Sequence, residues 1–262
     1  MKIKKIAAIL SLVLCFCLCF AACGNKTQEE APQPKTTPAL EGHSLHIYCG
    51  AGMTKPFQEI ADAFKEETGC EMEITFANAG QIQTQIHTAK EGDLFIAGSQ
   101  DELKPVSEAV TQHIDLVKHI PVLAVQKGNP LGIKGVADLG NAEIRVVLGD
   151  AESTPIGKIA NKALTDAGVM EQVNVVSRST TAPTIFNALT MDECDAVIVW
   201  KENANDKVDV IQDSGMEKYV KTIPAASLSY SEDEEARTAF LKYLGTDAAK
   251  TIWTNHGYEV LN

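Results

Sequence analysis

The chain has 262 residues, of which 45% are hydrophobic, and it carries a formal net charge of −12 at pH 7. A chain of this length can form one large domain or two lobes of ordinary size. The excess of acidic residues argues against binding to nucleic acid and against electrostatic docking on an anionic membrane surface.

The N-terminus has the pattern of an export signal. Three of the first five residues are lysines, and an uncharged apolar run follows over residues 6–20. This run is too short to span a membrane as a helix, but it suits the core of a signal peptide. It ends in Ala21-Ala22-Cys23, which resembles the lipobox of bacterial lipoproteins, although Phe20 stands where leucine is usual. The resemblance implies a signal peptide of residues 1–22 and lipidation of Cys23; an ordinary cleaved signal with an unmodified cysteine is the alternative.

Residues 23–42 are predicted to be a tether that begins at the lipidated Cys23. They hold Pro, Thr, Gln, Glu and Gly but no aromatic residue, so they cannot bury enough apolar surface to become ordered. Loss of three lysines with the signal would change the net charge from −12 to −15. We therefore expect a protein anchored by lipid to the extracytoplasmic face of a bacterial cell membrane.

Three further cysteines follow the lipidation site, namely Cys49, Cys70 and Cys194. Their odd number and wide spacing argue against a disulfide framework, although a single bridge stays open.

From residue 44 onward, short apolar strands alternate with amphipathic helices, which is typical of parallel α/β architecture. In the first set we predict strands at residues 45–49, 71–76 and 93–97 and helices at residues 56–67, 80–89 and 101–110. The second set follows a strand at 120–125, with strands at 144–148, 173–176 and 196–200 and helices at 155–167 and 183–191. The last part is predicted as an extended segment at 219–228, helices at 233–244 and 247–256, and a short extended segment at 258–261.

Two such sets predict two lobes, each with a mainly parallel sheet flanked by helices. The first lobe would hold residues 43–122 and 226–262, and the second would hold residues 123–225. Two crossings, near residues 121–124 and 223–227, would join the lobes.

Four of the predicted strand-to-helix turns are built of small residues, proline and hydroxyl-bearing residues. They are Gly50–Thr54, Asn78–Gly80, Ser153–Gly157 and Thr180–Pro183. The suitable N-cap residues in these turns are Thr54, Ser153, Thr154 and Thr181. A helix N-terminus offers unpaired backbone N–H groups and a partial positive charge, and ligands of open α/β sheets bind beyond the carboxyl ends of the strands. These turns, two from each lobe, therefore predict a site for one small anion, although each alone would be an ordinary turn.

Several stretches of the chain resemble the periplasmic molybdate-binding protein family in order and spacing. They are YCGAGMTKPFQEIADAFKEETG, FANAGQIQTQI, GDLFIAGS, GDAESTPIGKIANKAL and MDECDAVIVW. The resemblance covers nearly all of residues 44–262. It implies a type II periplasmic-binding-protein fold that closes on its ligand and delivers it to an ABC permease with its ATPase. The implied ligand is a small oxyanion such as molybdate or tungstate.

The resemblance also implies which residues bind the ligand. They are Gly52, Met53, Asn78, Ala79 and Gly80 in the first lobe and Ile156, Ala182 and Trp200 in the second. In molybdate binders two serines and a tyrosine are donors, and the corresponding residues here are Gly52, Ala79 and Trp200. Backbone donors are thus kept at all four turns, whereas three hydroxyl groups are missing. A sulfur oxyanion or a small carboxylate therefore stays open as the ligand, as does contact from Lys158 or Lys201.

Other chemistries have less support in the sequence. The Gly50-x-Gly52 stretch has Lys55 at the third glycine position of a dinucleotide fingerprint, and neither Ser99 nor Ser153 lies in a GxSxG context. We therefore expect no enzymatic activity and no cofactor, and we expect a monomer. The six histidines lack the paired spacing of zinc ligands. A metal-ion receptor and a non-transport sensor or adhesin lipoprotein remain as alternatives.

Overall fold

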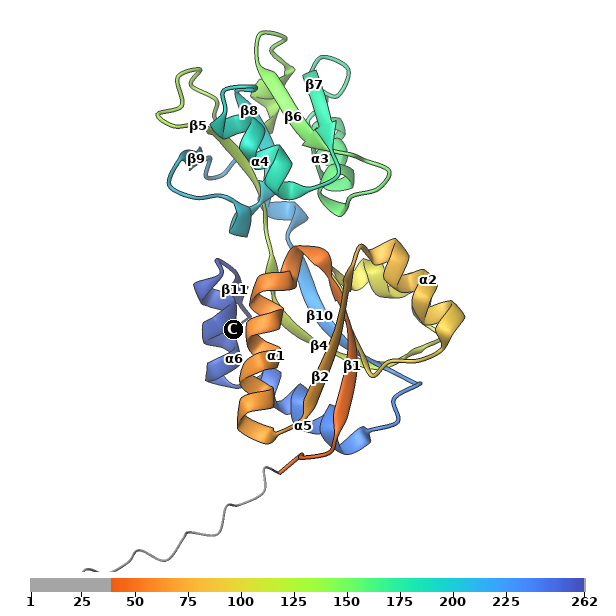
Figure 1. The fold of residues 1–262 in the computed structure, drawn as a ribbon. Helices are drawn as coiled ribbons and strands as arrows, with labels where there is room; N and C mark the ends of the chain where they lie inside the picture. The colour runs from red at the N-terminus through yellow and green to blue at the C-terminus, as the bar shows by residue number, and fades with distance from the viewer. Residues whose placement is uncertain (1–38, 262) are drawn as a thin grey trace, which may run out of the picture. The chain divides into compact units, whose positions relative to one another are not determined.

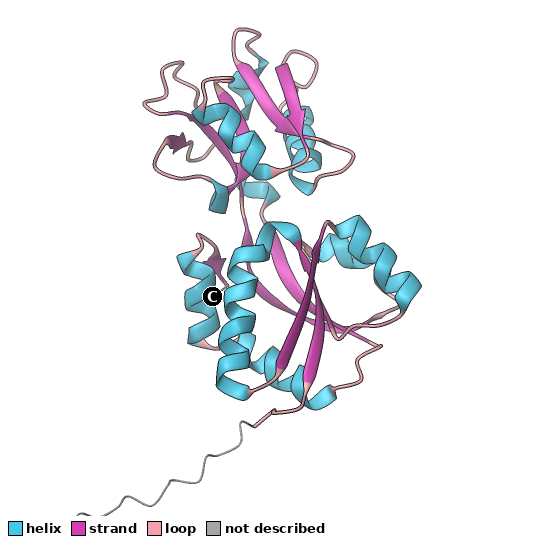
Figure 2. Cartoon of the chain, in the orientation of Figure 1, coloured by secondary structure: helices cyan, strands magenta, loops and turns pink. Residues whose placement is uncertain are grey.

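The computed structural model describes residues 39–261, which form two mixed β-sheets flanked by helices (Figures 1 and 2). The predicted signal peptide, Cys23 and all but the end of the predicted tether lie outside the described residues. Between residues 39 and 261, no helix is both long enough and apolar enough to cross a membrane.

The first sheet has six strands in the order β11-β4-β10-β3-β1-β2. Their bounds are β1 Ser44–Gly50, β2 Glu71–Ala77, β3 Leu94–Ile96, β4 Val110–His119, β10 Lys221–Leu228 and β11 Glu259–Val260. Strand β1 pairs in parallel with β2 and β3, whereas β10 is antiparallel to β3 and β4, and β11 is antiparallel to β4.

Helices cover both faces of the first sheet (Figure 1). One face packs against α1 (Thr54–Thr68), α5 (Glu234–Leu244) and α6 (Asp247–Asn255), and the other packs against α2 (Ala79–Ala89) and the 3-10 helix η2 (Gln100–Val106). Successive residues of a strand point to opposite faces. Accordingly, Ile47 and Cys49 of β1 join the core of the first face, and Tyr48 joins the core of the second.

The second sheet has five strands in the order β7-β6-β8-β5-β9. Their bounds are β5 Pro121–Gln126, β6 Arg145–Gly149, β7 Asn174–Ser179, β8 Ala196–Trp200 and β9 Val208–Val210. Strand β6 pairs in parallel with β7 and β8, and β5 is antiparallel to β8 and β9. Helices α3 (Pro155–Asp166) and α4 (Ala182–Thr190) share one hydrophobic core with these strands. The remaining 3-10 helices are η1 Ala51–Met53, η3 Val136–Gly140, η4 Lys201–Asn203 and η5 Glu217–Tyr219.

The chain passes from the first sheet to the second at Ile120, between β4 and β5. It returns after β9, and β10 pairs with β4 from Lys221 onward, where Lys221 faces His119. The chain therefore re-enters the first sheet before the crossing predicted near residues 223–227. The predicted crossing near residues 121–124 likewise falls inside β5, which pairs with β8 from Pro121 onward.

Some predictions of local structure were wrong. The helix predicted at 101–110 is the 3-10 helix η2, which contains Pro105 and ends at Val106, and β4 begins at Val110. Strand β4 gave no clear pattern because a run of exposed residues in its first half interrupts the alternation of a half-buried strand. Likewise, Tyr219 lies in η5 instead of an extended segment. Both sheets are mixed where mainly parallel sheets were predicted, because residue patterns do not report strand direction.

The three cysteines of the folded part, Cys49, Cys70 and Cys194, are buried and free. Burial raises the pKa of Cys70 to about 11 and that of Cys194 to about 12, and it raises the pKa of Cys49 as well. None of the three is therefore prone to ionise at neutral pH, which fits small packed side chains rather than reactive thiols.

Candidate functional site

In each sheet, two of the predicted turns leave the same edge side by side. The parallel register of β1 and β2 places Gly50 opposite Ala77, immediately before the first two turns. The register of β6 and β7 places Gly149 opposite Ser179, before the other two. The structure thus brings the four turns together as two pairs, each at the carboxyl ends of parallel strands, where ligands of α/β sheets bind.

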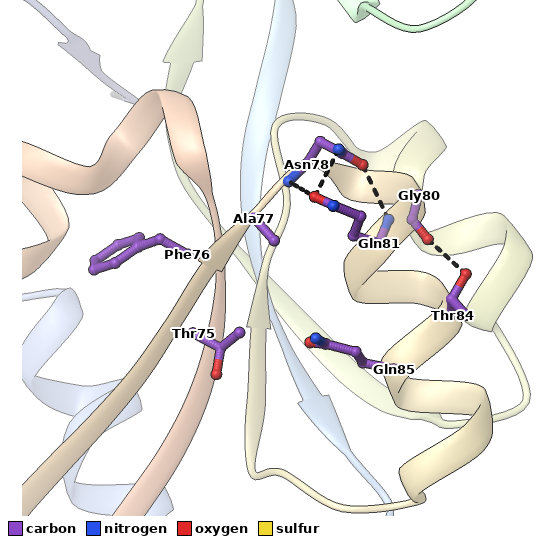
Figure 3. Close-up of a pocket in the computed structure, with 8 residues that line it drawn as sticks. All are labelled: Thr75, Phe76, Ala77, Asn78, Gly80, Gln81, Thr84 and Gln85. Atoms are coloured by element: carbon purple, nitrogen blue, oxygen red, sulfur yellow. Dashed lines mark hydrogen bonds between the residues drawn. The ribbon is translucent and has the colours of Figure 1, made fainter.

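Asn78 caps helix α2 and leaves two backbone donors unused. Its Oδ1 atom accepts a hydrogen bond from the backbone N–H of Gln81 at 3.0 Å, and the Gln81 side chain accepts from the Asn78 backbone and amide nitrogens (Figure 3). This capping box uses only the third N–H of the helix. The first two, on Ala79 and Gly80, have no acceptor within the helix.

Helices α3 and α4 are capped in the same way. The Thr154 hydroxyl accepts from the Gly157 N–H at 3.1 Å, and the Thr181 hydroxyl accepts from the Thr184 N–H at 3.4 Å. Each helix carries a proline, Pro155 or Pro183, in its first two positions, and proline has no N–H. One first-turn N–H without an acceptor inside its helix therefore remains in each, on Ile156 in α3 and on Ala182 in α4.

The other two predicted N-caps were wrong. Thr54 follows the 3-10 turn η1, and its hydroxyl donates to the Ala51 carbonyl at 2.8 Å instead of accepting from the helix. Ser153 donates from its backbone N–H and its hydroxyl to the Asp150 carboxylate, at 2.8 and 2.5 Å. These bonds lower the pKa of Asp150. The Asp150 carboxylate therefore accepts from Ser153 in this turn, and the Ile156 N–H is not among its donors.

Gly52 and Met53 differ in their surroundings. Met53 is buried in the core of the first sheet, where its Cε atom would lie 2.9 Å from a Cβ added to Gly50. Its side chain therefore packs, and only its backbone can face a ligand. Gly52 is exposed, and a Cβ added there would have no atom within 4 Å apart from its chain neighbours.

An open hollow of about 670 Å³ lies between β2 and the start of α2 (Figure 3). Its lining residues are Thr75, Phe76, Ala77, Asn78, Gly80, Gln81, Thr84 and Gln85. Of the predicted ligand residues, only Asn78 and Gly80 line this hollow. Ala79 lies between these two but is not part of the lining, and the others lie at other turns or, for Trp200, at the end of β8.

Trp200 is buried and stacks on His119, with ring centroids 3.4 Å apart and planes 17° from parallel. His119 also contacts the Gly98 carbonyl and the Glu202 carboxylate. These contacts of His119 could not be predicted from the sequence, because the histidine and Glu202 are 83 positions apart and no motif links them.

The two lysines left open by the sequence have different surroundings. Lys201 forms an ion pair with Glu259, so its charge is already matched. Lys158, in the first turn of α3, lies close enough to Glu102 of η2 to stabilise the charged form of that carboxyl. Burial is the larger effect and raises the pKa of Glu102, whose Oε2 atom accepts from the Gly98 N–H at 2.8 Å. Lys158 of α3, which packs on the second sheet, thus acts electrostatically on Glu102 of η2, which packs on the first.

Within residues 39–261, no group of three or more His, Cys, Asp or Glu side chains is arranged to hold a metal ion.

Comparisons with known proteins agree with this architecture. The family described as bacterial extracellular solute-binding protein matches residues 45–259. A Haemophilus influenzae protein named only as a binding protein is 30% identical over 183 residues, which are 67% of this chain and 75% of that protein. The molybdate-binding protein ModA of Escherichia coli is 24% identical over 258 residues, or 93% of this chain and 95% of ModA.

A solved structure extends the comparison to the fold. It is a substrate-binding domain assigned to a molybdenum ABC transporter of Clostridium difficile, with a TM-score of 0.70 at 22% identity. The match covers 84% of this chain and 99% of that domain. The predicted type II fold and the resemblance to molybdate binders are therefore confirmed.

Proposed function

Because the chain belongs to the bacterial extracellular solute-binding protein family, we propose that it is the receptor of an ABC importer and binds a small oxyanion between two lobes. The two lobes would correspond to the two sheets, so the bounds predicted from the sequence, 43–122 with 226–262 and 123–225, shift to the passage at Ile120 and to the return before Lys221. The protein would act as a monomer without catalysis or cofactor, and it would hand its ligand to a permease with its ATPase.

The observation that carries this proposal is the set of backbone N–H groups that the helix caps leave unused. They belong to Ala79 and Gly80 in α2, to Ile156 in α3 and to Ala182 in α4, and they are joined by the exposed turn at Gly52. Helix N-termini bind anions through such groups without any charged side chain. Each hydrogen bond to a charged group contributes about 1.5–3 kcal/mol, so four or five of them can hold an anion despite the acidic chain.

Trp200 would add one donor from the second lobe, because an indole N–H donates and cannot accept. Asn78 and Met53 would shape the first-lobe turns. A site made only of donors suits a fully ionised anion, which can accept at every oxygen.

Molybdate or tungstate is the leading candidate ligand, since ModA of Escherichia coli, named for molybdate, is similar over almost the whole chain. A sulfur oxyanion or a small carboxylate is the second candidate. The observation that favours it is the pair Gly52 and Ala79, which replace the serine donors of molybdate binders. Backbone groups alone discriminate less strictly among anions.

We further propose that Cys23 carries lipid and that residues 23–42 tether the binding domain to the outer face of the cell membrane. The supporting feature is the order of basic, apolar and small residues before Cys23. Growth with labelled palmitate should label the protein and not the Cys23→Ser variant; labelling of both would contradict the anchor.

Tryptophan fluorescence tests the proposed site directly, because Trp200 and Trp253 are the only tryptophans of the chain. Titration with molybdate, tungstate, sulfate and small carboxylates should change the emission of the parent protein. The change should disappear in Trp200→Phe, while the Trp253 signal stays. An undiminished response in Trp200→Phe would contradict the second-lobe assignment.

A further inference from the structure

A group of buried polar and aromatic side chains connects the two sheets at the point where β4 passes into β5. His119 is the last residue of β4, Trp200 is the last residue of β8, and Glu202 lies in η4. Tyr258 immediately precedes β11. His119 and Trp200 are each only 8% exposed, and Tyr258 is 5% exposed. The group therefore joins strands of both sheets with little access for water.

His119 is held on three sides. Its ring stacks on Trp200 at 3.4 Å between centroids, its Nδ1 atom lies 2.9 Å from the Gly98 carbonyl oxygen, and its Nε2 atom lies 3.0 Å from Glu202 Oε1. The side chains of His119 and Glu202 are 10% and 9% exposed. The two hydrogen bonds therefore fix the plane of the imidazole, and the imidazole plane fixes the plane of the Trp200 indole.

The hydrogen bonds also determine how many protons the group holds. A carbonyl oxygen only accepts, so Nδ1 of His119 carries a hydrogen and donates it to Gly98. Nε2 then either donates to the Glu202 carboxylate or accepts from a protonated Glu202. Both arrangements need one proton more than a neutral imidazole and a carboxylate have together. Without that proton, two acceptors would face each other at 3.0 Å.

Titratable groups from three other elements lie near the His119–Glu202 pair. Glu102 of η2 acts on His119 electrostatically, and Lys158 of α3 lies near Glu102. Burial raises the pKa of Tyr258, and the nearby Glu202 carboxylate raises it further. Cys49 of β1 lies near Tyr258 but is itself buried and un-ionised. The His119–Glu202 pair thus has Glu102 and Tyr258 as its titratable neighbours, and Lys158 lies next to Glu102.

We propose that His119 is a positioning residue for Trp200, and that it orients the indole only while the His119–Glu202 pair holds its shared proton. The proposal rests on the proposed role of Trp200 as a ligand donor. It makes anion binding depend on pH: affinity falls as pH rises and the pair loses its proton, because the imidazole then leaves Glu202 and the indole loses its fixed plane.

Glu202→Gln is the decisive variant. Its amide nitrogen can donate to Nε2 of a neutral imidazole, so the bridge to His119 persists without a shared proton. His119→Phe is the matched variant that keeps an aromatic ring beside Trp200 and removes both hydrogen bonds. Thermal unfolding of each variant shows that it is folded before it is compared.

The experiment follows Trp200 emission without ligand from about pH 6 to about pH 10, a range that spans histidine titration and extends above it. The Trp200 contribution is the difference between each protein and its Trp200→Phe counterpart. Calorimetry with molybdate, or with whichever anion of the panel binds, gives the affinity at the same pH values.

The parent should show a one-proton transition in emission, with an affinity about tenfold or more lower on the alkaline side, as expected for the loss of one hydrogen bond to a charged group. Glu202→Gln should bind without this transition, and His119→Phe should bind weakly at every pH. An emission transition that persists in Glu202→Gln, or a parent without one, would overturn the positioning role. A transition with constant affinity would overturn its link to the ligand. If no anion binds at all, the proposed function fails, and the ligand-free emission still decides the role of His119.

Discussion

Replacing Gly157 by alanine should destabilise the protein by about 3 kcal/mol or more and abolish anion binding. Gly157 is the third residue of α3, and its Cα packs against the backbone that leaves β6. A Cβ at this position would lie 2.3 Å from the Asp150 carbonyl oxygen and 2.6 Å from the Gly149 carbonyl carbon. Backbone atoms cannot rotate away, so the start of α3 must move, and the Ile156 N–H must move with it.

Urea denaturation and calorimetry measure the two effects. Gly80→Ala is the matched control for stability, because its added Cβ meets only Asn78 Oδ1 at 3.6 Å, an ordinary contact. That control should stay within about 1 kcal/mol of the parent. A Gly157→Ala protein as stable as the parent would show that the close approach of α3 to β6 is wrong.

Adding hydroxyl donors at Gly52 and Ala79 should strengthen binding of a tetrahedral oxyanion. Gly52→Ser and Ala79→Ser each add one donor, and a hydrogen bond to a charged group is worth about 1.5–3 kcal/mol, or about tenfold or more in affinity. Gly52 has open space for a side chain, and Ala79 is the first residue of α2. The gain should be larger for molybdate than for a small carboxylate, because a tetrahedral oxyanion has more oxygens that can accept.

Gly52→Ala is the control for this gain, since it adds the Cβ without the hydroxyl. Calorimetric titration of the parent, the control and the two serine variants gives their affinities. Comparing these affinities separates the effect of the added Cβ from the effect of the added hydroxyl. Equal affinity in the serine variants and in the parent would mean that the oxyanion does not approach these two turns.

Much of the fold could be predicted because local patterns and tertiary burial agree. Helix α1 shows this well: Phe57, Ile60 and Phe64 repeat at helical spacing, and all three are buried in the first core. Strand β4 could not be predicted, because the exposed side chains of its first half hide the alternation. Strand direction could not be predicted either, because the antiparallel pairing of β10 with β4 depends on where the chain returns to the first sheet and not on the residues of β10.

Part of the candidate site could likewise be predicted from the sequence, and part could not. Thr154 and Thr181 were predictable caps because each precedes a proline by one or two positions and is followed by an amphipathic helix. Thr54 was wrongly predicted as a cap, because the 3-10 helix η1 precedes α1. The Thr54 hydroxyl therefore donates to the Ala51 carbonyl instead of accepting from the helix. The stacking of His119 on Trp200 depends on two chain crossings and leaves no trace in local sequence.

The central claim is that the unused helix N-termini bind an oxyanion, and thermal unfolding in the presence of ligands tests it most directly. The chain without its signal peptide, residues 24–262, would be heated with molybdate, tungstate, sulfate, thiosulfate and small carboxylates in turn. An anion present at 100 times its Kd should add about 2.7 kcal/mol to the free energy of unfolding, and a metal chelator should not remove this effect. Stabilisation by none of these anions, or stabilisation that a chelator abolishes, would contradict the account.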